Sequence, residues 1–278
     1  MNTSYTVPSA VVERRDVKRD EVNKRGLMGF PVDLAGDVEA QQGLEKLLRS
    51  LEGPTVFESP TSPLKLPVTA DFSAQMLYYF LVGDYEEHDL RLIRQHVLPG
   101  SRVLELGGGV GLTGSMLGMV SGNPVTICEP NAALYASIER TFKANGALVL
   151  LVKAAVVADH VEAPTIPFHI SRDYWWSSLV RDDQQITVDV PAIRLSEAIQ
   201  LSCADTLVVD IEGYETELLG DVQCLSGINT LLIEIHTPSI GTAATGALVT
   251  NLIRAGFDLV DLAAHTFVFK RPNELPRK

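Results

Sequence analysis

The chain has 278 residues, of which 46% are hydrophobic and 21% charged, the balance of an ordinary globular protein. This length suits one large α/β domain with an extension, whereas two full domains would be cramped. The formal net charge of −12 disfavours binding to the phosphate backbone of nucleic acid or to an anionic membrane surface.

The first 70 residues predict an N-terminal arm followed by a helical extension. Residues 11–25 mix six basic with four acidic side chains, which is typical of a solvated arm or an exposed helix. Docking on a partner subunit, and with it a homodimer, is the less favoured alternative. Leucines recur at helical spacing over residues 37–51. The next stretch, EGPTVFESPTSPLKLP, contains four prolines and turn residues, and we interpret it as the connection between the extension and the larger domain.

Residues 71–278 show the regular alternation of strands and helices that is typical of one large α/β domain. Apolar runs predict strands at 102–106, 124–128, 148–154, 205–210 and 230–235, with a closing pair in FDLVDL and TFVFK. Amphipathic patterns predict helices at 72–82, 86–97, from about 111, and at 132–144, 214–225 and 245–255. This alternation indicates a mostly parallel sheet covered on both faces. Only a few residues join the closing pair, so it predicts an antiparallel hairpin.

The cysteines and the apolar runs favour a cytoplasmic protein. Three cysteines at wide spacing form no CxxC pair and no metal-ligand pattern with histidine, so we expect them to be reduced. The N-terminal stretch MNTSYTVPSAVVERRD lacks the apolar segment of a signal peptide. The longest apolar run, GALVLLVKAAVVA, is too short to span a bilayer and is interrupted by Lys153. It predicts a buried strand instead.

A glycine-rich turn, LELGGGVGLTG, follows the first strand of the larger domain. Ligands of open α/β sheets bind at the carboxyl ends of the strands, and glycines let them approach the backbone closely. GVGLTG matches the GxGxxG pattern of dinucleotide sites. However, the match starts three residues after the strand, and four carboxylates would surround a pyrophosphate: Glu105, Glu129, Asp210 and Glu212. S-adenosylmethionine fits better because it carries a sulfonium and an ammonium and no phosphate.

The stretch VVDIEGYETELL places four carboxylates around one glycine. If the cofactor lies across the first, second and fourth strands, Asp210 and Glu212 face the site. Glu215 and Glu217 then fall in the first turn of the next helix, whose dipole stabilises each of them by about 0.3–1 kcal/mol. We interpret Glu217 as a helix-start residue, whereas Glu215 either starts the helix or supports the site.

These motifs resemble the FkbM family of S-adenosylmethionine-dependent methyltransferases. The resemblance is carried by VGDYEEHDLRLIRQHVLPGSRVLELGGGVGLTG, by the D-x-E-G-x-E pattern in VVDIEGYETELL and by LLIEIH, and it covers roughly residues 80–240. It implies the α/β class I methyltransferase (Rossmann-like) fold and methylation of a hydroxyl group on a sugar or secondary metabolite. One departure is the GGG at residues 107–109, where the family often has a bulkier residue and an asparagine.

The resemblance also implies which residues bind the cofactor. The glycine loop with Glu105 would line the methionine half, Glu129 would hold the ribose, and the end of the third strand would lie along the adenine. Tyr85 and Glu86 match a "YE" pair upstream of the first strand that would close over the cofactor. The full set is Tyr85, Glu86, Glu105, Gly107, Gly109, Gly111, Glu129, Pro130, Ala154, Ala155 and Asp210.

Methyl transfer to a hydroxyl group requires a general base as well as alignment. The candidates are Asp210, Glu212 and His236, which directly follows the fifth strand. A polar insert offers flat faces and hydroxyls to a small-molecule acceptor, in Trp175, Trp176, Ser177 and Ser178. Asp210 and Glu212 could contribute to a divalent metal site, but too few further ligands can be placed from the sequence, so no metal is predicted.

Three alternatives remain open from the sequence. Transfer to nitrogen needs a weaker base than transfer to oxygen. A cofactor-binding module without turnover would act through the N-terminal arm, although the cofactor glycines and the acidic motif are both intact. An NAD-dependent oxidoreductase lacks a convincing proton-relay pattern. The favoured hypothesis is a cytoplasmic O-methyltransferase of a small molecule.

Overall fold

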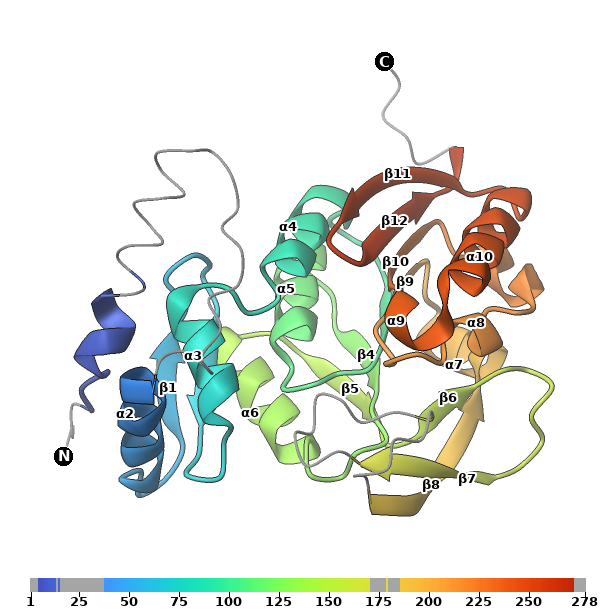
Figure 1. Ribbon diagram of the computed structural model, residues 1–278. Coiled ribbons are helices and arrows are strands. Elements are labelled where there is room, and N and C mark those ends of the chain that lie inside the picture. The colour runs from blue at the N-terminus through green and yellow to red at the C-terminus, as the bar shows by residue number, and fades with distance from the viewer. Residues whose placement is uncertain (1–4, 14, 16–37, 171–178, 180–185, 273–278) are drawn as a thin grey trace. The chain divides into compact units, whose positions relative to one another are not determined.

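The computed structural model describes residues 5–13, 15, 38–170, 179 and 186–272. The chain folds as two compact units, Met1–Glu87 and His88–Lys278 (Figure 1). The predicted boundary between residues 70 and 71 stays a prediction. Within the described ranges, no helix combines the length and the apolar character that crossing a lipid bilayer requires.

The smaller unit combines helices with a hairpin of two strands. Its elements include α2 (Val38–Arg49), β1 (Thr55–Glu58), β2 (Lys65–Val68) and α3 (Ala74–Val82). The helix expected over residues 37–51 is present, and its leucines face inward. The proline-containing stretch that was expected to connect the extension to the larger domain lies within the smaller unit, where β1 and β2 pair antiparallel. Pro67 fits within β2 because a two-stranded sheet has only edge strands, where a missing N–H breaks no central ladder.

The larger unit is built on a seven-stranded sheet. Its strands are β3 (Val103–Leu106), β4 (Val125–Cys128), β5 (Val149–Val152), β9 (Thr206–Val209), β10 (Thr230–Glu234), β11 (Asp258–Ala263) and β12 (Thr266–Lys270). The strand order is β11-β12-β10-β9-β3-β4-β5. The five strands from β10 to β5 run parallel, and β12 and β11 form the predicted antiparallel hairpin at one edge. The predicted α/β fold, a mostly parallel seven-stranded sheet that ends in an antiparallel hairpin, is confirmed.

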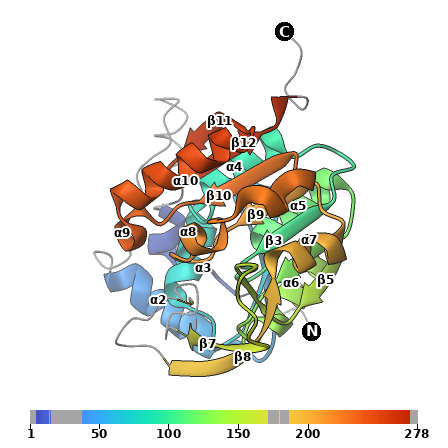
Figure 2. The ribbon, with the colours of Figure 1, turned by 90° about the vertical axis from the view of Figure 1, so that its right-hand side faces the viewer.

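Helices cover both faces of this sheet (Figure 1, Figure 2). They are α4 (Glu87–His96), α5 (Leu112–Ser121), α6 (Tyr135–Asn145), α7 (Leu195–Ser202), α8 (Glu215–Leu218), α9 (Thr237–Ile240) and α10 (Thr242–Arg254). Leu104 and Leu106 of β3 share a core with α7, α8 and α10. Glu105, between them, contacts Thr113 of α5. Since successive residues of a strand point to opposite faces, α5 covers the other side.

Two predicted elements of the larger unit are divided in the structure. The run GALVLLVKAAVVA forms two strands, because β5 ends at Val152 and β6 (Ala155–Val157) joins a separate sheet with β7 (Thr165–Ile170) and β8 (Ile186–Arg194). Figure 2 shows β7 and β8 at the end of this unit opposite β11 and β12. The helix predicted over 214–225 ends after one turn, and a 3₁₀ helix, Val222–Gly227, starts anew where Asp221 caps the backbone N–H of Gln223.

The register of the sheet decides which residues meet at its carboxyl edge. Leu106 of β3 is paired with Cys128 of β4 on one side and with Val209 of β9 on the other. The next residue of each strand, Gly107, Glu129 and Asp210 respectively, therefore follows at the same level. The strand order reverses between β3 and β9, and this switch point is where open α/β sheets bind ligands.

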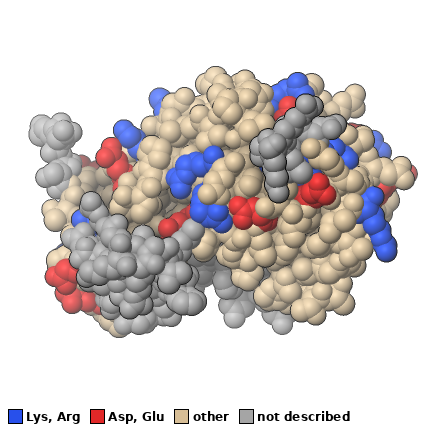
Figure 3. Space-filling model, turned by 90° about the horizontal axis from the view of Figure 1, so that it is seen from above, with Lys and Arg blue, Asp and Glu red and all other residues tan. Residues whose placement is uncertain are grey.

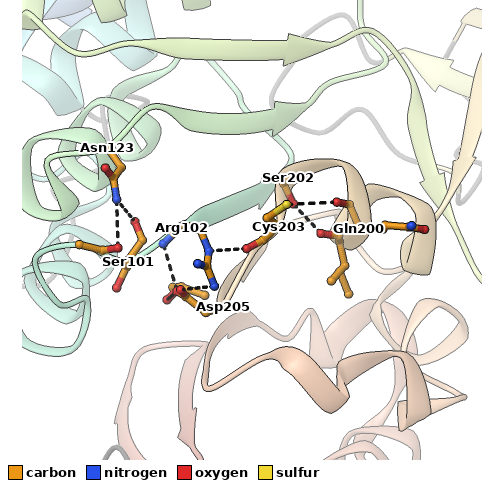
Figure 4. Close-up of polar contacts among 10 residues, drawn as sticks. Ser101, Arg102, Asn123, Gln200, Ser202, Cys203 and Asp205 are labelled. Atoms are coloured by element: carbon orange, nitrogen blue, oxygen red, sulfur yellow. Dashed lines mark hydrogen bonds and ion pairs between the residues drawn. The ribbon is translucent and has the colours of Figure 1, made fainter.

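Polar contacts connect the segments at the amino ends of the parallel strands, opposite the carboxyl edge (Figure 4). Just before β3, the backbone N–H of Arg102 donates to Asp205, and the Arg102 side chain forms an ion pair with Asp205 at 3.2 Å and donates to the carbonyl of Cys203. The Asn123 side chain donates to the carbonyls of Gly100 and Ser101. These contacts tie the amino ends of the central strands together.

Candidate functional site

The glycine loop passes directly over the end of β9. Gly107 has a φ of +87°, and a Cβ at this position would lie 1.8 Å from the carbonyl oxygen of Asp210. Its N–H donates to the carbonyl of Cys128 at 3.1 Å, and the N–H of Asp210 donates to the carbonyl of Leu106 at 2.9 Å. Only glycine combines this left-handed conformation with so close an approach. Gly109 and Gly111 also have positive φ angles, and Gly111 starts α5.

Glu105 supports the loop from the face of the sheet that α5 covers. The Thr113 hydroxyl donates to its Oε1 at 2.6 Å, while Oε2 is buried without a hydrogen-bond partner among the described residues. A Cβ on Gly114 would lie 2.4 Å from that oxygen, so α5 packs tightly on the carboxyl group. Burial raises the pKa of Glu105 from 4.5 to about 8, with Glu129 adding repulsion and Thr113 opposing the rise.

Glu129 is held in place by the backbone at the carboxyl edge. The N–H of Gly108 donates to Oε2 at 3.0 Å, and the N–H of Asn131 donates to Oε1 at 2.7 Å. Burial raises the pKa of Glu129 from 4.5 to about 7, although these backbone hydrogen bonds oppose the rise. The carboxyl group therefore has a fixed orientation before any ligand binds.

A pocket opens at this edge, with an empty volume of about 430 Å³ that includes the solvent at its mouth. Five predicted cofactor residues line it: Gly107, Glu129, Pro130, Ala155 and Asp210. Its other lining residues are Leu106, Cys128, Val156, Phe168, Leu179, Ile211 and Tyr214. None of the described lining residues is Lys, Arg or His. The pocket thus combines acidic groups and bare backbone with an apolar wall.

The remaining predicted residues lie elsewhere. Glu105, Gly109 and Gly111 shape the loop, and Ala154 is buried beside Ala155 between β5 and β6. Tyr85 and Glu86 belong to the smaller unit. The predicted acceptor residues Trp175, Trp176, Ser177 and Ser178 lie outside the described residues.

Sequence reasoning missed the apolar wall of the pocket. Phe168 comes from β7, more than thirty residues after Glu129 in the chain, and only the folding of the insert brings it to the edge. Tyr214 belongs to the acidic motif itself, and its position directly after Gly213 could have identified it as a residue that lines the pocket. Ala155 was predicted as the end of a strand but begins β6.

The three predicted catalytic residues form one cluster beside the pocket. Nε2 of His236 lies 3.1 Å from Glu212 Oε2, 3.7 Å from Asp210 Oδ1 and 3.8 Å from Glu234 Oε1. On the other side of the ring, Nδ1 lies 2.7 Å from Oε1 of Glu215. Asp210 and Glu212 follow β9, and His236 follows the neighbouring strand β10, so the parallel pairing of these strands brings the groups together.

The fully buried Glu215 anchors this cluster. Its Oε1 accepts a hydrogen bond from the N–H of Gly213 at 2.8 Å as well as contacting His236. Its side chain has no exposed surface, and Oε2 has no hydrogen-bond partner among the described residues. Glu215 therefore supports the site, which was one of the two interpretations open from the sequence. Glu217 is exposed and lies 3.2 Å from His160, away from the cluster.

The charges in the cluster shift one another's pKa values. Burial lowers the pKa of His236, but the hydrogen bond with Glu215 and the charges of Asp210 and Glu212 outweigh this effect and raise it to about 10. Burial and repulsion from Glu234 and Glu212 raise the pKa of Asp210 well above its usual value. Burial likewise raises the pKa of Glu234 to about 7. The cluster is an excess of carboxylates around one imidazole.

Comparisons with known proteins add little to this geometry. No family model matches the sequence, and no curated protein matches it. Fibrillarin, a pre-rRNA processing protein of Methanococcus jannaschii, aligns with 13% identity over 63% of this chain and 68% of its own, with a TM-score of 0.40.

Two further structures align to a similar degree. Aeropyrum pernix fibrillarin with natively bound S-adenosyl-L-methionine has 10% identity over 62% of this chain and 67% of its own, with a TM-score of 0.38. The ribosomal protein L11 methylase of Lactobacillus delbrueckii subsp. bulgaricus has 11% identity over 68% and 79%, with a TM-score of 0.41. The function of this chain therefore has to be argued from its own residues.

Proposed function

We propose that the protein is an S-adenosylmethionine-dependent methyltransferase that methylates a hydroxyl group of a small metabolite or sugar. The observation that carries this proposal is the pocket at the switch point of the sheet. It presents Glu129, Asp210 and the bare backbone of Gly107, with no basic side chain among its described lining residues. A pyrophosphate would meet repulsion there, whereas a positively charged ligand would not.

Each part of S-adenosylmethionine has a chemical match in this pocket. The Glu129 carboxylate can accept both hydroxyls of a ribose, and its backbone contacts orient it in advance. Ala155, Val156 and Phe168 offer an apolar surface to the adenine ring. Asp210 offers its carboxyl group to the ammonium and sulfonium groups, whose positive charge would favour the ionised form of that group. When bound, this cofactor supplies an activated methyl group.

The residues beside the pocket support oxygen as the acceptor atom. A hydroxyl group needs a proton acceptor, and Asp210, Glu212 and His236 gather at the edge where β9 and β10 end. The motif that carries the resemblance to the FkbM family, DIEGYE, forms this edge, which supports a relationship to that family. The net charge of −12 favours a small molecule over RNA as the acceptor.

Ligand binding tests the cofactor assignment. S-adenosylhomocysteine should raise the melting temperature of the purified chain, and NAD⁺ should not, because only the former lacks a pyrophosphate. The Glu129→Gln variant should bind S-adenosylhomocysteine about 10–100-fold more weakly in calorimetry, since hydrogen bonds to a charged group contribute about 1.5–3 kcal/mol. Glu139→Gln, on the exposed side of α6, serves as the matched control. Tight binding of NAD⁺ without a response to S-adenosylhomocysteine would overturn the proposal.

Product analysis tests the acceptor. Incubation with hydroxylated small molecules and S-adenosylmethionine should give a product that is heavier by one methyl group in mass spectrometry. A cofactor carrying a ¹³C-labelled methyl group then shows by its chemical shift whether the methyl is bonded to oxygen or to nitrogen. An N-methyl product would refute the hydroxyl assignment and leave the cofactor assignment intact.

A further inference from the structure

We propose that Asp210, Glu212 and His236 bind a divalent metal ion next to the pocket. Oδ1 of Asp210, Oε2 of Glu212 and Nε2 of His236 could each offer one ligand atom, and the three atoms lie within 4.8 Å of one another. A single ion can contact three atoms at that spacing, because metal–ligand distances in proteins are about 2.0–2.6 Å. The inference deepens the proposed function, on which it rests for its chemical role.

The orientation of His236 supports a metal at Nε2. Metal-binding histidines nearly always donate the N–H of the other ring nitrogen to a carboxylate or carbonyl, which fixes the tautomer. Glu215 occupies that second position, with Oε1 2.7 Å from Nδ1. Glu215 is fully buried on α8, and the N–H of Gly213 holds the same oxygen. Nε2 is thereby directed toward Asp210 and Glu212.

A buried oxygen and the number of nearby carboxyl groups point to a cation at this place. Oδ1 of Asp210, one of the proposed ligand atoms, is buried without a hydrogen-bond partner among the described residues. Such an oxygen loses several kcal/mol of hydration unless a cation or a donor compensates it. Among the described residues, the ion pairs of Asp210, Glu215 and Glu234 all involve the same partner, His236. The described side chains therefore place one cationic group among these three carboxyl groups.

The ligand set indicates the class of metal. Two carboxylates and one imidazole are hard or borderline ligands, which suit Mn²⁺ and Mg²⁺ and exclude a thiolate-type site. Three protein ligands leave coordination positions open on such an ion. An acceptor hydroxyl could occupy one of them, and the ion would then orient and polarise that oxygen. The acceptor class would accordingly be molecules with a hydroxyl group able to bind a metal ion, such as diols.

Direct metal binding tests this site without activity. The full chain, stripped with EDTA, is titrated with Mn²⁺, and free Mn²⁺ is measured by electron paramagnetic resonance. We expect one Mn²⁺ per chain, and at least a tenfold loss of affinity in Glu212→Gln and His236→Ala. Glu215→Gln, a positioning change, should weaken binding about 10–100-fold. Glu217→Gln, exposed on the same helix, is the matched control and should bind Mn²⁺ as the unmodified chain does.

The outcomes separate the metal site from the proposed function. S-adenosylhomocysteine binding, measured as a melting-temperature shift on the same samples, reports whether each variant is folded. If the unmodified chain binds S-adenosylhomocysteine but no Mn²⁺, the metal site is refuted and the methyltransferase proposal stands. If Mn²⁺ binds with equal affinity to the unmodified chain and to folded Glu212→Gln and His236→Ala, the ion lies elsewhere, and the site is also refuted. Mn²⁺ binding without S-adenosylhomocysteine binding supports the site and counts against the cofactor.

Discussion

Glu105 and Glu129 are buried carboxyl groups beneath the same loop, but their neighbours donate different hydrogen bonds to them. Glu129 accepts two backbone N–H groups, whereas Glu105 has one hydroxyl donor and an oxygen without a partner. Burial raises the pKa of Glu105 further, to about 8 compared with about 7 for Glu129. At neutral pH, therefore, the folded chain retains a proton on Glu105 that the unfolded chain releases.

The pH dependence of stability should report this proton. Between pH 4.5 and 8, the unfolded chain binds fewer protons at Glu105 than the folded chain, so this group lowers stability as pH rises. The slope is at most about 1.4 kcal/mol per pH unit. Glu105→Gln cannot ionise, so its stability relative to the unmodified chain should increase by about 2–3 kcal/mol from pH 5.5 to pH 7.5 in urea unfolding. Glu139→Gln should show no such increase. If the unfolding free energies of Glu105→Gln and of the unmodified chain change with pH in the same way, the prediction is contradicted.

Gly107→Ala should disrupt the edge of the sheet. The new Cβ would lie 1.8 Å from the carbonyl oxygen of Asp210, in a left-handed backbone conformation that by itself costs about 1–2 kcal/mol. We expect a larger loss of unfolding free energy than this strain alone, together with loss of S-adenosylhomocysteine binding. Gly122→Ala has the same kind of φ but nothing within 4 Å of its Cβ, so it isolates the strain. Equal losses in the two variants would show that the contact has no effect.

Among the elements, the edge hairpin β11–β12 is fastened to the sheet by Arg271, just after β12. Its guanidinium donates to the carbonyls of Leu225, Ile228 and Ala255, and it lies 4.3 Å from the centre of the Phe257 ring. Leu225 and Ile228 lie in and just after the 3₁₀ helix, and Ala255 follows the end of α10. One side chain therefore joins two connections that are far apart in sequence.

Arg271→Met should destabilise the larger unit. The variant keeps most of the apolar stem but removes three charge-assisted hydrogen bonds, so we expect a loss of about 2–4 kcal/mol in urea unfolding. Arg271→Lys should restore only part of it, because an ammonium cannot reproduce the planar fork of donors. Arg254→Met, exposed on α10, is the control. If Arg271→Met unfolds at the same urea concentration as the control, the carbonyls are satisfied by water instead.

At the scale of the whole molecule, the net charge of this chain is unfavourable for binding nucleic acid. The net charge is −12, and on the face seen in Figure 3 basic and acidic side chains are interspersed, with no basic patch among the coloured residues. Nucleic-acid affinity comes largely from Lys and Arg that neutralise phosphates. The fold alone does not decide the acceptor.

RNA binding should be absent or weak. In fluorescence anisotropy at about 150 mM salt, a labelled single-stranded or structured RNA should show no saturable binding at micromolar protein concentrations, since nonspecific affinities even of basic proteins are about 10⁻⁴–10⁻⁶ M. A basic RNA-binding protein is the positive control. Saturable binding that weakens steeply with added salt would contradict the small-molecule proposal.

Local patterns in the sequence were sufficient for most of the architecture. The period of apolar residues distinguished strands from helices, and the glycine run after 102–106 marked the loop of the site, because both signals depend on residues next to each other in the chain. They failed at GALVLLVKAAVVA and at 214–225, where one apolar pattern continues through a change of direction. Periodicity does not report where a strand changes sheets.

The sequence by itself determined the fold class, the glycine-rich loop after the first strand and the acidic character of the residues that follow the strands, because these follow from residue type and local spacing. Only the tertiary structure decided that Phe168 and Glu129 line the same pocket and that Glu215 contacts His236. Such contacts join residues far apart in the chain, and they arise from the register of neighbouring strands, which packing over the entire sheet selects.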